Sequence, residues 1–208
     1  MPDATTTIET VTVVRPLKVI SLICEILALL TLLLSLSTCA WLKCEGYFKS
    51  GIFQECTYAN PRYHSLPNGA PAPGQCQMSR IVEKPYFQIT AALLVLAGAV
   101  ILASIGVTGA GLSTINYGQR YLYYRIAMYL SLIGLIAQQI ALVVFPLCFY
   151  FELEMWFGST WELDWSYGVG WGSSICTFFA CALLIADKER EEVYYKEKTV
   201  YTNSQMVV

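Results

Sequence analysis

The sequence has little charge for its length. Of 208 residues, 13 are Lys or Arg and 15 are Asp or Glu, so charged residues make up 13% of the chain. A soluble domain of this size needs more polar surface than these residues provide. The formal net charge of −2, and the lack of a basic run interleaved with aromatics, exclude nucleic acid as the expected partner.

Residues for catalysis or metal binding are scarce too. The chain has one histidine, His64, and it contains no Cys-x-x-Cys, no paired His, no Gly-rich phosphate loop and no nucleophile elbow. These motifs carry most of the recognisable enzyme and metal chemistry in sequences. We therefore expect no enzyme activity, no cofactor, no metal site and no small-molecule substrate.

Long apolar sequence, in contrast, is abundant. Four stretches hold about 20 or more mostly apolar residues each, the length that an α-helix needs to cross a bilayer. They cover residues 17–40, 86–112, 126–149 and 165–186. The sequence predicts an all-α membrane fold, a four-helix transmembrane bundle over residues 17–186 between terminal segments 1–16 and 187–208. The first stretch is too long for the core of a cleaved signal peptide, so we expect a retained signal anchor.

Basic residues indicate the orientation in the membrane. Arg15 and Lys18 lie at the start of the first predicted helix, and Arg120 and Arg125 lie in the short segment between the second and the third. Lys188 and Arg190 follow the fourth. The loop 150–164 has no Lys or Arg, although the loop 41–85 holds five. Basic residues favour the cytoplasmic side, so we expect both termini in the cytoplasm and both loops outside the cell. We expect a multi-pass protein of the plasma membrane.

The two loops carry signals for short strands. Residues 41–58 combine aromatic side chains with Gly46 and Gly51 as turn signals, which favours a hairpin. Residues 150–157 alternate with a period of two, which predicts a strand that continues out of the third helix. Together they predict a small extracellular antiparallel sheet above the bundle.

The first loop also contains a spaced motif. Trp41 is followed by Gly51-Ile52-Phe53, then by Cys56 and Cys76. This order resembles the W…G-L-W-x-x-C…C signature of the superfamily of claudins, epithelial membrane proteins and peripheral myelin protein. The segment 164–171 looks most like the branch of the brain cell membrane protein and the apoptosis effector related to peripheral myelin protein.

The resemblance has consequences for the loop and also departures. It implies a disulfide between Cys56 and Cys76, and closing about 20 residues stabilises a fold by about 3 kcal/mol in the chain-entropy model. Phe53 stands where the signature has Trp, and the two cysteines are further apart than in claudins, which puts a selective pore in doubt. Cys44 is additional, with three alternatives: a free thiol, a bridge to Cys148, or a bond to a second molecule.

The disulfide and the aromatic residues of the motif have simple physical roles. The disulfide would hold the small loop together, and it would also present an adhesive edge; the two roles are compatible. We expect Trp41 and Phe53 to lie where the sheet meets the lipid headgroups.

Two features lie within the predicted helices. Gly168, Gly172, Cys176 and Ala180 place a small residue at every fourth position, which favours close helix packing within the bundle and, as the second alternative, lateral self-association. Glu25 is the one acidic residue inside a span, and polar residues at matching depth are Ser104, Thr108, Tyr129 and Ser131. We favour a protonated or hydrogen-bonded structural Glu25 over a proton or ion path.

The chain ends in Met206-Val207-Val208. A free carboxylate with apolar side chains at the last and third-last positions suits a PDZ groove, which binds such ends by strand addition. A scaffold with a PDZ domain is therefore a candidate partner, and the alternative is a solvated tail.

The resemblance implies a structural protein of lateral cell–cell junctions. Its loops would contribute to adhesion or to the organisation of the paracellular barrier, with membrane lipid and like or related four-span proteins as partners, in the same or the opposing membrane. The alternative is an auxiliary or trafficking subunit of a channel or receptor. A paracellular pore is weaker, because the first loop lacks a dense run of like charge.

Overall fold

The computed structural model describes residues 4–10, 16–44, 48–59, 71–79, 85–114, 116–153, 161–186 and 195–201. Four helices account for most of them, and they are α1 (Pro16–Ser37), α2 (Pro85–Ser113), α3 (Tyr117–Leu153) and α4 (Trp165–Ala186). All four are long and apolar enough to span a membrane. A helix satisfies its own backbone hydrogen bonds, which hydrocarbon requires of any spanning segment. The predicted four-span membrane fold is confirmed.

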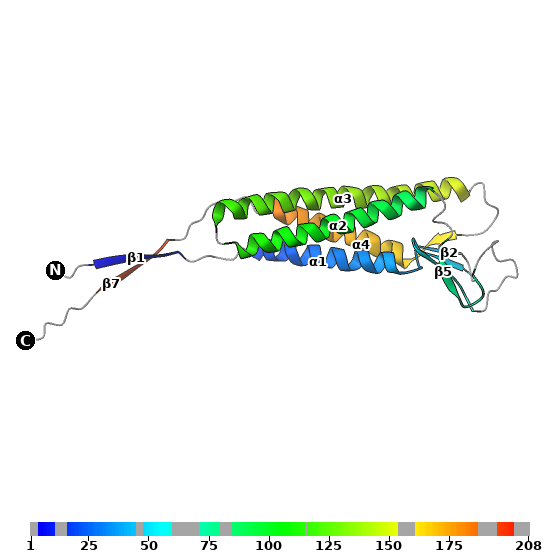
Figure 1. The fold of residues 1–208 in the computed structure, drawn as a ribbon, viewed down its shortest axis with the longest axis horizontal. Helices are drawn as coiled ribbons and strands as arrows, with labels where there is room; N and C mark the ends of the chain where they lie inside the picture. Colours follow the sequence, from blue (N-terminus) through cyan, green and yellow to red (C-terminus); the bar gives the residue numbers. More distant parts are fainter. Residues whose placement is uncertain are drawn as a thin grey trace, which may run out of the picture.

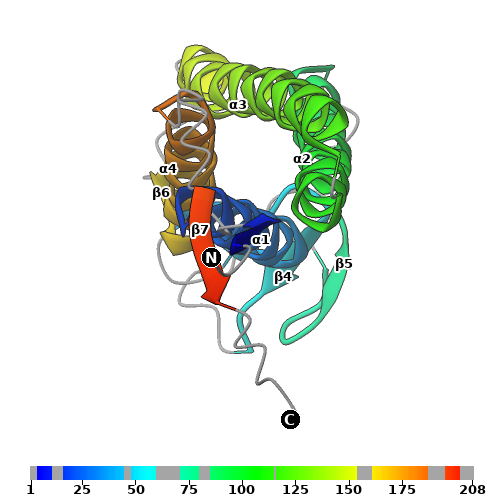
Figure 2. The ribbon, with the colours of Figure 1, turned by 90° about the vertical axis from the view of Figure 1, so that its left-hand side faces the viewer.

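The helices form one bundle in which chain neighbours lie side by side. Viewed along the axis, α1, α2, α3 and α4 follow one another around a ring (Figure 2). Their outward surfaces are apolar, as Leu30, Leu102 and Ile185 show with 57%, 59% and 57% of their areas exposed. Such residues suit contact with lipid.

A five-stranded antiparallel sheet, the loop sheet, covers one end of the bundle (Figure 1). Its strands are β2 (Leu42–Cys44), β3 (Phe48–Ser50), β4 (Gln54–Thr57), β5 (Cys76–Met78) and β6 (Trp161–Leu163). The strand order is β5-β4-β3-β2-β6, so the first loop supplies four strands and the second loop adds one edge. This confirms the predicted antiparallel sheet from both loops and the hairpin within residues 41–58.

The strand predicted at residues 150–157 is wrong in its described part. Residues 150–153 continue α3, which passes through Pro146 without ending, and residues 154–157 lie outside the described chain. Packing at helical spacing explains the difference, because Phe145 and Phe149 stack at 6.3 Å and Phe149 meets Trp161 at 5.8 Å between ring centroids. Tertiary contacts of this kind override a local period of two. The strand that the structure describes in this loop is β6, Trp161–Leu163.

The other end of the bundle carries both ends of the described chain. Here β1 (Ala4–Thr10) and β7 (Tyr195–Tyr201) pair antiparallel, with Ala4 opposite Tyr201 (Figure 1). Both termini therefore lie on one side of the spans and the loop sheet on the other, as an even number of crossings requires.

The main apolar core lies directly under the loop sheet. Its fully buried members include Trp41, Phe87, Leu142 and Phe145, and a smaller cluster around Tyr124 and Leu184 fills the opposite end. The loop sheet and the bundle thus share one core, so the sheet is held to the helices by packing as well as by the chain.

Candidate functional site

The loop sheet is fixed to the bundle by Trp41. This side chain is fully buried, and its rings meet those of Phe145 and Tyr167 edge to face at centroid distances of 5.1 and 5.6 Å. Its indole Nε1 donates a hydrogen bond of 2.7 Å to the carbonyl oxygen of Ser35.

The expected place of Trp41 at the lipid headgroups is therefore wrong. Ser35 lies in the last turn of α1, where carbonyls have no acceptor role within the helix. An indole N–H that has such a carbonyl within reach does not need the interface to satisfy its hydrogen bond. Phe53, the other residue expected at the headgroups, is 39% exposed, and its position relative to lipid stays a prediction.

Gly51 allows β3 and β4 to pass close to the end of α1. A Cβ at this position would overlap the carbonyl oxygen of Thr38 and would lie 2.8 Å from the Cα of Cys39. Both neighbours are backbone, which cannot rotate away. The next residue, Ile52, is fully buried in the shared core. The signature residues Trp41, Gly51 and Ile52 therefore hold the sheet against the end of the bundle.

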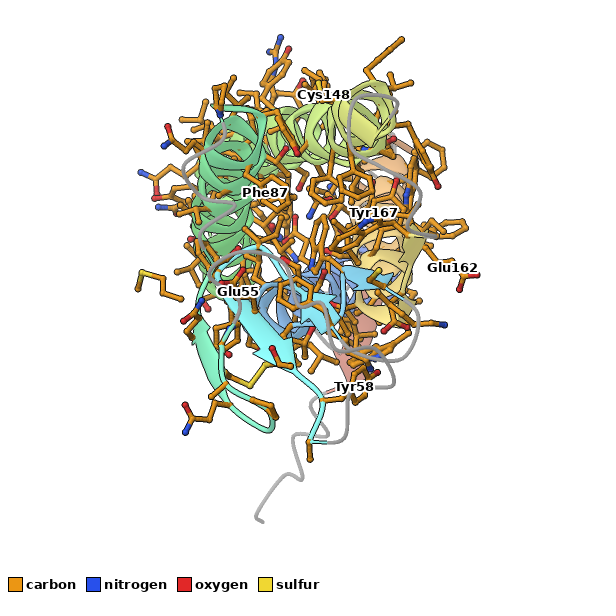
Figure 3. All side chains as sticks on the ribbon, turned by 90° about the vertical axis from the view of Figure 1, so that its right-hand side faces the viewer. Glu55, Tyr58, Phe87, Cys148, Glu162 and Tyr167 are labelled. Carbon is orange, nitrogen blue, oxygen red and sulfur yellow. A yellow bond between two sulfur atoms is a disulfide. The ribbon has the colours of Figure 1, made fainter. Side chains whose placement is uncertain are left out.

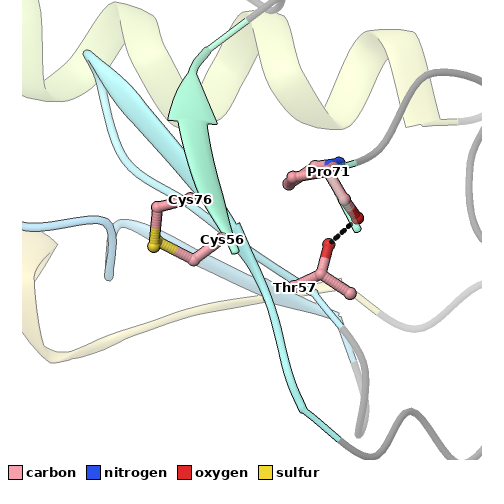
Figure 4. The surroundings of a disulfide bond; sticks show 4 residues. All are labelled: Cys56, Thr57, Pro71 and Cys76. Atoms are coloured by element: carbon pink, nitrogen blue, oxygen red, sulfur yellow. Dashed lines mark hydrogen bonds between the residues drawn. A yellow bond between two sulfur atoms is a disulfide. The ribbon is translucent and has the colours of Figure 1, made fainter. Parts of the chain in front are cut away.

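The predicted disulfide between Cys56 and Cys76 is formed, and it joins β4 to β5 where the two cysteines face each other in the register (Figure 4). Next to it, the Thr57 hydroxyl donates a 2.9 Å hydrogen bond to the carbonyl of Pro71 (Figure 4). The two links together hold the edge strand β5 and the chain that leads into it. The strand has only three residues, so the ladder alone would hold it weakly.

The additional cysteine is not bridged to α3. Cys148 is a free, partly buried cysteine, so a Cys44–Cys148 bond is absent. Cys44 is 1% exposed on the inner face of β2, which also removes it from contact with a second molecule.

Two ion pairs join the loops on the sheet's outward face. Lys43 on β2 lies 3.2 Å from Glu162 on β6, and Lys49 on β3 lies 3.4 Å from Asp164. The Lys43–Glu162 pair is exposed, and pairs of this kind stabilise a fold by about 0–1 kcal/mol, so it chiefly favours the pairing of β2 with β6. The Lys49–Asp164 pair is partly buried. Figure 3, which looks onto this end, shows Glu162 and Tyr58 at the rim and Phe87 and Tyr167 inside the ring of helices.

Lys49 is the better integrated of the two lysines. Burial lowers the pKa of Lys49, but the Tyr58 hydroxyl and the Asp164 carboxylate outweigh it, and the pKa is raised above its ordinary value. The ion pairs were missed at the sequence level. The sequence did contain a signal for them. The first loop holds five basic residues, and all the charged residues of 150–164 are acidic.

The small residues of α4 are placed differently from the expectation of packing within the bundle. A Cβ on Gly168 or Gly172 would meet no atom within 4 Å, and Cys176 is only partly buried. Of the four, Ala180 alone is fully buried. Packing inside the bundle is thus wrong for Gly168 and Gly172, and self-association through them stays a prediction.

Gly170 is the residue that permits the close approach. A Cβ there would lie 3.2 Å from Leu142 Cδ2 and 3.2 Å from Ser35 Oγ. The buried face of α4 carries Ser166, Ser173 and Thr177, whose hydroxyls need partners on other helices. Hydroxyls in hydrocarbon favour such contacts, and this preference turns Gly168 and Gly172 outward.

Glu25 lies inside the bundle with 1% of its area exposed. Its two carboxyl oxygens lie within hydrogen-bond distance of the hydroxyls of Ser131 at 2.6 Å, Ser104 at 2.7 Å and Thr108 at 3.3 Å. These are three of the four polar residues expected at its depth. The fourth, Tyr129, is 49% exposed and points outward. The acid is hydrogen-bonded to α2 and α3, so it links three helices.

A second polar layer was not foreseen. Gln138 on α3 donates to Ser173 at 3.1 Å and accepts from Thr177 at 3.2 Å, while Ser173 donates to the carbonyl of Ala28 at 2.7 Å. The helical spacing of Ser173 and Thr177 on α4 is the signal that could have paired them with Gln138.

Met206–Val208, the proposed PDZ ligand, lies outside the described residues. Among the residues that the structure does describe, no three His, Cys, Asp or Glu side chains gather as a metal site would require. No known family model matches the chain. The resemblance to claudins therefore rests on the motif residues of the sequence.

Proposed function

We propose that this chain is a claudin-like structural membrane protein of cell–cell contacts, which acts through the loop sheet. The observation that carries the proposal is the construction of this sheet. It takes strands from both loops, it is closed by the Cys56–Cys76 bond, and it shares a core with the bundle through Trp41.

A preorganised surface suits adhesion. Binding two surfaces costs free energy for every loop that must be ordered, and a sheet that is already rigid avoids much of this cost. The outward face of the loop sheet carries Lys43, Lys49 and Glu162, and β5 is an edge with 80% of Met78 exposed. These features support contacts with proteins in the same or the opposing membrane.

The tail has its own part in the proposal. With both termini on the side opposite the loop sheet, a sheet outside the cell leaves Met206 and Val208 in the cytoplasm. There the free carboxylate would bind a PDZ scaffold by strand addition. The outer contact and the inner scaffold would then be connected through four helices.

A mixed culture tests the proposal. Cells that express a fluorescent version of the chain are grown beside cells that do not. We expect enrichment at borders between two expressing cells and none at borders with a non-expressing cell. The double variant Cys56→Ser/Cys76→Ser, scored only for surface-labelled protein, should lose the enrichment, whereas Cys148→Ser should keep it.

Two outcomes would contradict the proposal. An even surface distribution of the wild type would mean that the sheet does not mediate contact between cells. A punctate pattern that follows a co-expressed channel or receptor would instead support the role of an auxiliary or trafficking subunit.

A further inference from the structure

The bundle contains a group of buried oxygens around Glu25 that the adhesive role does not use. This group, the Glu25 cluster, consists of the Glu25 carboxyl, the hydroxyls of Ser104, Thr108 and Ser131, and the carbonyl of Ala127. It belongs to α1, α2 and α3, and all four side chains are at most 1% exposed.

The cluster has more close oxygen contacts than hydroxyl hydrogens. Five pairs lie within hydrogen-bond distance: Ser131 to Glu25 Oε1 at 2.6 Å, Ser104 to Glu25 Oε1 at 2.7 Å, Ser104 to Ser131 at 2.9 Å, Ser104 to Ala127 O at 3.1 Å and Thr108 to Glu25 Oε2 at 3.3 Å. A hydroxyl carries a single hydrogen, and an ionised carboxyl and a carbonyl carry none. Three hydrogens fill three of the five contacts.

We propose that the Glu25 cluster is a proton-binding site, in which Glu25 is a neutral acid that heads a directed chain of hydroxyls. Its Oε1 hydrogen is donated to Ser131, Ser131 donates to Ser104, and Ser104 donates to the Ala127 carbonyl. Thr108 donates to the other carboxyl oxygen, Oε2. One added proton thus gives four contacts a hydrogen and leaves only the Ser104–Oε1 contact without one.

A metal ion fits the same oxygens less well. Hard cations such as Ca²⁺ hold oxygen ligands at about 2.3–2.6 Å, which keeps neighbouring ligands more than about 3 Å apart. Three of the contacts in the cluster are 2.6–2.9 Å, which are the distances of O–H···O hydrogen bonds. An unprotonated carboxylate would moreover be a charge removed from water, and no cation of the described residues lies beside it.

The charged and titratable groups around the cluster agree with a neutral acid. On α1, the Lys18 ammonium lies 3.9 Å from the centroid of the Tyr124 ring of α3, and seven residues of helix, about 10 Å, separate it from Glu25. Cys24 on α1 and Cys181 on α4 are thiols that interact electrostatically with Glu25. Residues 100–113 of α2 have no ionisable side chain.

Infrared spectroscopy of the purified full-length protein tests the site. At neutral pH we expect the carbonyl stretch of a protonated carboxylic acid in the wild type, and its loss in Glu25→Gln. Ser131→Ala should shift this band, because the acid loses the acceptor of its hydrogen. Glu162→Gln is the matched control, since Glu162 is on the exposed face of the loop sheet and should leave the band unchanged.

The contrary results are as clear. If Glu25→Gln removes a carboxylate band and the acid band is absent from the wild type, Glu25 is ionised and the proposal fails. If Glu25→Gln does not fold, the shift in Ser131→Ala decides alone, and an unshifted band overturns the assignment. The proposal also fails if replacing choline by sodium raises the unfolding temperature of the wild type but not of Ser131→Ala, because the site would then hold a metal cation.

Discussion

At the scale of single residues, Trp41 and Gly51 decide how the loop sheet meets the helices. Trp41 combines an apolar body, buried against Phe145 and Tyr167, with one donor that binds the end of α1. Gly51 is required because backbone, which cannot move aside, occupies the space of its missing side chain. Neither role involves lipid, so both residues act on stability rather than on membrane contact.

Substitutions at Trp41 separate its donor from its bulk. In Trp41→Phe the Ser35 carbonyl keeps the hydrogen bond from Ser166, at 2.9 Å, so we expect a loss of about 1 kcal/mol in the free energy of unfolding. Trp41→Ala should lose about 3–5 kcal/mol, because it also removes the ring contacts. Thermal unfolding in detergent measures both. Trp165, 51% exposed, is the control, and equal effects of the matching substitutions at the two positions would disprove the buried role.

The second prediction at this scale concerns Gly51→Ala. The added methyl group overlaps backbone of residues 38 and 39, and we expect a loss of about 1–3 kcal/mol in the free energy of unfolding, typical of overpacking. Gly106→Ala in α2 is the control, since its Cβ would meet nothing within 4 Å and alanine favours a helix. An unchanged unfolding temperature in Gly51→Ala would show that the strands stand further from α1.

At the scale of elements, α4 shows how polar residues select the face that packs. Its hydroxyls face α1 and α3, so Gly170 lies at the contact and Gly172 does not. Gly170→Leu should lower the free energy of unfolding by about 1–3 kcal/mol, while Gly172→Leu should leave the monomer unchanged.

The same pair of variants tests self-association. Gly172→Leu should reduce lateral clustering in the membrane only if the outward stripe binds another molecule, which cross-linking or single-molecule imaging would detect. If Gly172→Leu unfolds the monomer and Gly170→Leu does not, the rotation of α4 described here is wrong.

The edge strand β5 depends on its disulfide. We expect the Cys56→Ser/Cys76→Ser variant to lose about 3 kcal/mol in the free energy of unfolding, as the closure of a loop of 20 residues implies. Hydrogen exchange should speed up in residues 76–78 and remain slow in the helices. Exchange that rises equally in all elements would mean that the sheet and the bundle unfold as one unit.

At the scale of the whole molecule, the four spans, the position of both termini on the same side of them and the loop sheet could be predicted from the sequence. Length and apolarity suffice for helices in lipid, and α4 occupies the residues predicted for it. The hydrogen-bond partners of Glu25 could be predicted from their depth in the membrane. The rise per residue of a helix determines which residues of neighbouring helices lie at the same depth.

The predictions that were wrong depended on the rotation of helices about their axes and on long-range packing. The period of two at residues 150–157 does not indicate that Phe149 packs against Trp161, some twelve residues later in the chain. The outward turn of Gly168 and Gly172 follows from hydrogen bonds between residues distant in sequence, such as Ser35 and Ser166. The burial of Trp41 follows from its ring contacts with Phe145 and Tyr167, which are equally distant. Such partners cannot be identified from local periodicity.

The most direct test of the central claim, that the loop sheet makes contacts between cells, is cryo-electron tomography of borders between cells that express this chain alone. The account expects density that bridges the two membranes at borders between expressing cells, and its loss in Cys56→Ser/Cys76→Ser protein that has reached the surface. Borders of the same spacing without bridging density, where the wild type is abundant in both membranes, would contradict it.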